Sequence, residues 1–80
     1  MNPPRDPHAV RKRSVRLAGH RTSVSIEEPF WVELTAIAKS RGLSLDRLIA
    51  HIDQERGGNL SSAIRLYVLA ALKQETERAS

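Results

Sequence analysis

The residues best suited to binding chemistry are the basic ones that precede position 23. Residues 1–22 contain six Lys or Arg and one Asp, a balance of +5, whereas residues 23–80 contain seven Lys or Arg and eight Asp or Glu, a balance of −1. A basic segment on a near-neutral body favours a polyanionic partner, because neutralised phosphates release their counterions. Nucleic acid is therefore the first candidate partner. A basic tail that only aids solubility is the alternative.

Patterns for catalysis and metal binding are missing from the sequence. His8, His20 and His51 are isolated, and there is no cysteine, so no metal-ligand spacing can be found. Gly57-Gly58 lacks the fingerprint of a phosphate-binding loop, and no serine lies in a nucleophile-elbow pattern. We therefore expect no enzyme, no metal and no cofactor.

The size of the chain predicts one small domain that self-associates. A core in a chain of 80 residues rarely supplies more than about 3 to 5 kcal/mol, and no disulfide adds to it. The longest strongly apolar stretch, Ile64 to Leu72, is far shorter than the roughly 20 residues that span a bilayer. Met1 to Val10 has no apolar segment typical of a secretory signal. We expect a cytoplasmic protein without a membrane partner.

The elements that must position the basic residues begin with a strand. Residues 1–13 hold three prolines and are predicted to form a disordered basic arm. Residues 14–76 are predicted to fold, and residues 77–80 to form a tail. Apolar and polar residues alternate between Ser14 and Ile26, which is typical of a strand. Ala18-Gly19-His20 interrupts the pattern, either as the turn of a hairpin or as a bulge in one long strand.

The alternation also assigns faces to the second half of this segment. If Val24 and Ile26 face the core, then Arg21, Ser23 and Ser25 fall on the opposite, solvent face. Ser25 has a structural alternative, because Ser25 and a glutamate three residues later could form a capping box for the next helix.

Three helices are predicted after the strand. Residues 27–40 carry an apolar face at three-to-four spacing and end before Gly42. Ser44 is a plausible N-cap for a helix to residue 56. A third helix, capped by Ser61 or Ser62 and running to about Gln74, is apolar nearly all round. Such a helix must be buried on several sides, which we expect to include another subunit.

The chain resembles a known family in the order of its elements, which are a basic strand, an amphipathic helix, a glycine-containing turn and a second amphipathic helix. Residues 20–56 resemble the ribbon-helix-helix superfamily of bacterial Arc-type repressors. The matching features are the segment Arg21–Trp31, then Leu34, Ile37, Ala38, Arg41–Ser44, Leu48 and Ile49. The resemblance implies a mostly α fold with a short β-strand, in which two chains form an intermolecular two-stranded antiparallel ribbon in a dimer. The third helix is an addition to that minimal fold.

The resemblance also implies roles for particular residues. A two-stranded ribbon fits the major groove, where Arg can bond guanine and Ser can bond either base type. Base contacts would come from Arg21, Ser23 and Ser25. The start of the second helix would bind phosphate, although Ser44 could equally be a plain cap. The expected phosphate contacts are Leu43, Ser44, Leu45, Lys39 and Arg41, with Arg11, Lys12, Arg13 and Arg16 from the arm. The expected dimer core is Val24, Ile26, Trp31, Leu34, Leu48, Ile52 and Tyr67.

Two other functions compete with this prediction. In a helix-turn-helix protein, the second helix would contact bases through Asp46, Arg47, Ala50 and His51. In a protein-interaction module, such as an antitoxin or adaptor, the apolar third helix would bind a partner protein. RNA binding has less support as a function, because the basic segment has no aromatic residues to stack on bases. We predict a bacterial-type transcriptional regulator that binds double-stranded DNA as a homodimer, with a tetramer as the alternative.

Overall fold

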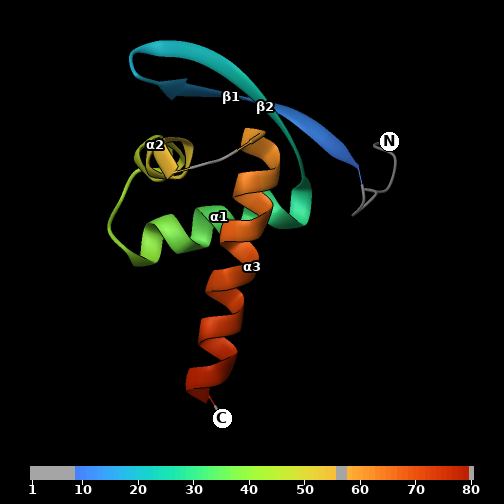
Figure 1. The fold of residues 1–80 in the computed structure, drawn as a ribbon, viewed down its shortest axis with the longest axis vertical. Coiled ribbons are helices and arrows are strands. Elements are labelled where there is room, and N and C mark those ends of the chain that lie inside the picture. The colour runs from blue at the N-terminus through green and yellow to red at the C-terminus, as the bar shows by residue number, and fades with distance from the viewer. Residues whose placement is uncertain (1–8, 56–57, 80) are drawn as a thin grey trace, which may run out of the picture.

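The computed structural model describes residues 9–55 and 58–79 as a two-stranded antiparallel sheet followed by three helices. The helices lie on one side of the sheet, and α3 runs away from it toward the C-terminus (Figure 1). This order confirms a mostly helical ribbon-helix-helix fold with an additional C-terminal helix. The elements are β1 (Val10–Leu17), β2 (His20–Glu27), α1 (Glu28–Ser40), α2 (Leu45–Glu55) and α3 (Leu60–Ala79).

The two strands belong to one chain and form a hairpin. Ala18 and Gly19 connect them with φ angles of 53° and 80°, and positive φ at both central positions is typical of a tight hairpin turn. The question left open by the sequence, hairpin or bulged strand, is therefore answered by the hairpin. Within the chain β1 pairs with β2, and the pairing between two chains expected from the resemblance stays a prediction.

The first strand starts earlier than the sequence predicted. β1 begins at Val10, so Arg11, Lys12 and Arg13 lie in a strand and not in a disordered arm. Their backbone is held in the ladder of the hairpin, where they lie opposite Ile26, Ser25 and Val24 in that order. Residues 1–8 of the expected arm lie outside the described residues.

Helix α1 is bounded by backbone geometry at both ends. Its N-cap is Glu27, without a side-chain capping bond, so Ser25 stays in β2 and the capping-box alternative does not apply. At the other end Gly42 has a φ of 68°. The N–H of Leu43 donates to the carbonyl of Ala38 at 2.9 Å, which closes the helix as glycine-ended helices commonly close.

The caps of α2 and α3 explain where these helices begin. The Arg47 N–H donates to Ser44 Oγ at 3.2 Å, which confirms Ser44 as the cap of α2. The prediction for α3 was wrong, because its cap is Asn59, whose Oδ1 accepts from the Ser62 N–H at 2.9 Å. The helix starts at Leu60 and continues to Ala79, so residues 77–79 of the expected tail are helical, and residue 80 lies outside the described residues.

The hydrophobic core closes within a single chain. β1, β2 and all three helices contribute to it, and the largest fully buried side chains come from β2 and the helices. Trp31 and Tyr67 are half-buried against the same cluster. Five of the residues expected in a dimer core, Val24, Ile26, Leu34, Leu48 and Ile52, are buried within one chain, and their part in a dimer stays a prediction. The buried residues are Val15, Val24, Ile26, Leu34, Ala38, Leu48, Ile49, Ile52, Ile64 and Val68.

The described residues contain neither a candidate membrane-spanning helix nor a cluster of metal-binding side chains. Among residues 9–55 and 58–79, no helix has both the length and the apolar character needed to cross a membrane. The same part of the chain contains no group of three or more His, Cys, Asp or Glu side chains placed to hold a metal ion.

Candidate nucleic-acid interface

The hairpin register assigns every residue of the two strands to one of two faces. Directly opposite residues of an antiparallel pair share a face, and the face alternates along each strand. Val15 is opposite Thr22, and Arg13 is opposite Val24. Val15 and Val24 are each 3% exposed, so this set of residues faces the helices. The other set faces solvent.

The outward face of the hairpin is basic and hydroxylated. It carries three consecutive cross-strand pairs, and all six side chains are exposed. The structure thus brings the expected base contacts Arg21, Ser23 and Ser25 onto one surface, as the strand period predicted. The pairs are Arg16 with Arg21, Ser14 with Ser23, and Lys12 with Ser25.

One acid lies at the far end of this face and is neutralised by another element. Glu27 ends β2 opposite Val10, and its Oε1 accepts from Arg65 Nε on α3 at 2.8 Å. This hydrogen bond is the main reason why the pKa of Glu27 lies below its ordinary value, and a backbone hydrogen bond and the charge of Arg65 lower it further. The carboxylate therefore stays charged but is paired with a cation.

Arg13 does not belong to the outward face. Its guanidinium forms an ion pair with Glu28 and lies 4.9 Å from the centroid of the Trp31 ring, a distance at which cation–π attraction operates. Its side chain is 25% exposed. Arg11 is on the same side as Arg13 by register, opposite Ile26, but is exposed near the strand end. Of the expected arm cations, Lys12 and Arg16 are the two on the outward face.

The N-terminus of α2 lies against the outer edge of β1. The Arg16 backbone N–H donates to Asp46 Oδ1 at 3.3 Å, which brings the first turn of α2 next to the basic face. Leu43 and Leu45 are half-buried on either side of exposed Ser44. A helix N-terminus favours an anion through its free N–H groups and its dipole, whereas the carboxylate of Asp46 in the same turn weakens the attraction for phosphate.

The remaining expected phosphate contacts lie at the turn between α1 and α2. Lys39 and Arg41 are both exposed. Arg41 donates a hydrogen bond to the Tyr67 hydroxyl, and its guanidinium lies 5.4 Å from the Tyr67 ring centroid. Arg41 is therefore held against α3.

The outer edge of β2 borders an open groove. The Ser61 hydroxyl of α3 donates to the Ser25 carbonyl at 2.7 Å, so the backbone groups of Ser25 point away from β1. Because backbone direction alternates along an antiparallel strand, those of Ser23 and Arg21 point to the same outer edge. A groove of about 610 Å³ runs beside residues 22–25 and is bounded by Leu60 and other residues near the start of α3.

Helix α2 is a poor alternative as the element that contacts bases. Asp46, Arg47 and His51 are exposed, and Ala50 is half-buried. Over its whole length, however, α2 carries three acidic residues and one basic residue. An acidic helix is repelled by the phosphates that flank the major groove. The helix-turn-helix alternative therefore has less support than the hairpin.

Ser14 is the residue of this face that the sequence interpretation missed. It is exposed and directly opposite Ser23. The pattern that could have identified Ser14 is the alternation of apolar and polar residues, which continues upstream through Val15 and Leu17. Taken with a hairpin, that alternation places Ser14 on the same side as Lys12 and Arg16.

The family model of the ribbon-helix-helix domain matches residues 10–72, which include both strands, α1, α2 and most of α3. No curated protein and no solved structure gives a significant match.

Proposed function

Because this chain belongs to the ribbon-helix-helix family, whose members are typically DNA-binding transcription regulators, we propose that it is a sequence-specific regulator of bacterial type. It binds double-stranded DNA in the cytoplasm through the outward face of the β1–β2 hairpin. The observation that carries this proposal is the set of three exposed cross-strand pairs on that face.

The chemistry of the pairs suits the major groove. Arg21 can donate two hydrogen bonds to the edge of a guanine, and the hydroxyls of Ser23 and Ser25 can bond either a donor or an acceptor. Arg16 lies directly opposite Arg21. Like charges in this arrangement destabilise a ribbon, and an anionic phosphate bound nearby offsets the repulsion.

A homodimer formed along the outer edge of β2 accounts for the geometry best. The exposed backbone groups of Arg21 and Ser23 can pair with the same groups of a second copy, which would enter the groove beside residues 22–25. The result is a four-stranded sheet with the two β2 strands at its centre. Pairing of this kind satisfies an otherwise open strand edge.

This sheet separates base contacts from phosphate contacts. Strands lie about 4.8 Å apart, so the two outer strands are about 14 Å apart, slightly more than the major-groove width of about 12 Å. The central β2 strands would place Arg21, Ser23 and Ser25 at the bases. The outer β1 strands would place Lys12 and Arg16 at the phosphates on either side, with Ser44 close behind.

Selection from a random duplex library tests the proposal. The purified protein is expected to enrich a short palindromic site, and Arg21→Ala is expected to lose that enrichment while its helical circular dichroism stays unchanged. Failure of the folded wild-type protein to enrich any duplex would overturn the proposal. It would favour a protein partner on α3, where Leu66 and Leu69 are 66% and 50% exposed.

A further inference from the structure

We propose that the groove between α1 and α3 is an interface that joins two copies of this chain, apart from the DNA-binding face. The groove has a volume of about 580 Å³. It is lined on α1 and its C-cap by Glu33, Ile37 and Arg41, and on α3 by Leu72, Glu75 and Arg78, with small and polar residues between them.

The α3 side of this groove continues the face that is buried in the core. Ile64 and Val68 are fully buried, and steps of three or four residues lead from Val68 through Ala71 to Glu75 and Arg78. From residue 72 to residue 78 every side chain of α3 is exposed. Figure 1 shows this half of α3 running away from the hairpin. Among the described residues, nothing therefore covers the C-terminal end of the side of α3 that faces the core.

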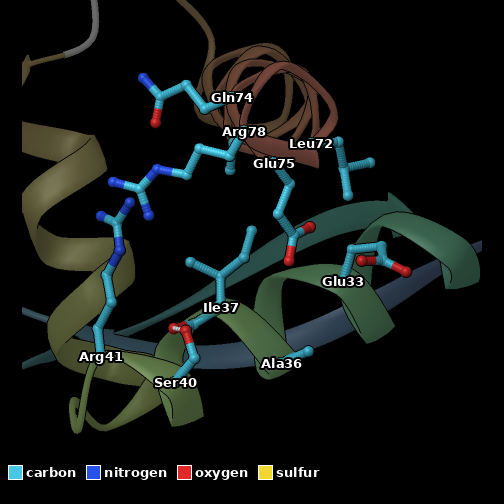
Figure 2. Close-up of a pocket in the computed structure, with 10 residues that line it drawn as sticks. Glu33, Ala36, Ile37, Ser40, Arg41, Leu72, Gln74, Glu75 and Arg78 are labelled. Atoms are coloured by element: carbon cyan, nitrogen blue, oxygen red, sulfur yellow. Dashed lines mark hydrogen bonds between the residues drawn. The ribbon is translucent and has the colours of Figure 1, made fainter. Parts of the chain in front are cut away.

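The charges in the groove are separated into two ends. Figure 2 shows the guanidinium groups of Arg41 and Arg78 together at one end, and the carboxylates of Glu33 and Glu75 toward the other, with Ile37 between them. Within residues 9–55 and 58–79, no side-chain hydrogen bond or ion pair involves Glu33, Glu75 or Arg78. Three charges thus line an apolar floor without partners of their own.

This distribution fits a second copy of the same chain. In a two-fold interface, a residue of the first copy that contacts a given residue of the second copy is matched by the reverse contact, with the two copies exchanged. A two-fold axis through Ile37 would place the acidic end of one groove against the basic end of the other, twice. A polyanion would be repelled by the glutamates and a polycation by the arginines, so the self-complementary partner is favoured.

The interface goes beyond the proposed function and does not depend on it. The outward face of the hairpin lies on the far side of the sheet from the helices, and the exposed half of α3 points away from the sheet (Figure 1). Two copies joined at α1 and α3 would keep both basic faces free. With dimers formed along β2, the groove would produce a tetramer that can bind two sites.

Charge reversal tests the interface. Arg78→Glu makes the groove acidic and Glu75→Arg makes it basic, so each variant alone is expected to have half the wild-type mass in sedimentation velocity. An equimolar mixture of the two variants is expected to recover the wild-type mass, because opposite grooves then face each other. A folding defect would not be repaired by mixing. The control is Lys73→Glu, an exposed change of the same charge outside the groove, which should keep the wild-type mass.

The outcomes separate this proposal from the function proposed above. If either single variant keeps the wild-type mass, or if the mixture stays at half mass, the interface is overturned. Affinity for a single DNA site should be unchanged in Arg78→Glu. A wild-type protein that binds no DNA but shows the mass change and its recovery would contradict the DNA-binding function and leave the interface standing.

Discussion

Arg16 and Arg21 lie directly opposite each other on the solvent face of the hairpin. Both side chains are exposed, and like charges at this cross-strand position destabilise the ribbon. Only the pair Leu17 with His20 separates these two arginines from the turn. The proposed DNA-binding function gives a reason for such a pair, because an anion bound beside the two guanidinium groups would offset the repulsion.

The two arginines are expected to contact different parts of the DNA, Arg16 a phosphate and Arg21 a base. Arg16→Ala is expected to weaken binding to every duplex by a similar factor and to lower the slope of log affinity against log salt by about 1, as loss of one phosphate contact does. Arg21→Ala should cost about 1 to 3 kcal/mol on the selected site and little on other sequences. Fluorescence anisotropy at several salt concentrations measures both effects. Equal changes in salt slope and specificity for the two variants would contradict this division.

Arg13 and Lys12 provide a second comparison, between neighbours on opposite faces. Arg13→Ala removes the ion pair with Glu28 and the contact with Trp31, and should lower the free energy of unfolding by about 1 kcal/mol. DNA affinity should be preserved. Lys12→Ala should do the reverse, with unchanged stability and weaker binding. Urea unfolding and DNA titration of both variants decide the matter, and a large loss of affinity in Arg13→Ala would place Arg13 at the DNA.

Proline tests which strand edge forms the dimer. The N–H of Ser23 points away from β1, so Ser23→Pro should leave the hairpin ladder intact but remove a donor needed by a second copy. Ser14→Pro is the matched change on the outer edge of β1. Sedimentation should show that Ser23→Pro loses the β2 contact and halves in mass, while Ser14→Pro keeps the wild-type mass. The opposite pattern would move the dimer contact to β1.

The sequence was sufficient for the main elements because their patterns are local. Alternation placed Val24 and Ile26 in the core and Arg21 in solvent, and the three-to-four spacing gave α1 and α2 to within a residue or two of their bounds. The hairpin turn could not be decided, because Ala18 takes a positive φ that is ordinarily left to Gly or Asn.

Other features depended on contacts that no local pattern contains. Arg11, Lys12 and Arg13 form one basic run, and only the pairing register shows that Arg13 points toward Trp31 and Glu28. Asn59, Ser61 and Ser62 were all chemically able to cap α3, and position along the chain did not choose among them. The groove between α1 and α3 exists only because two distant helices cross.

The ion pair between Glu27 and Arg65 should make stability depend on pH at the acidic end. The pKa of Glu27 in the folded chain is lowered below its ordinary value of 4.5, chiefly by the hydrogen bond from Arg65. A lowered folded-state pKa stabilises the protein above the unfolded-state value, and this stability is lost as the pH falls through the folded-state pKa. The free energy of unfolding of the wild type should therefore fall as the pH is lowered below about 4.5. In Glu27→Gln this component of the fall should be missing, since the amide does not titrate. Urea unfolding of both proteins from neutral pH to the acid range measures the difference. Parallel curves for the two proteins would show that the pair linking β2 to α3 adds no pH-dependent stability.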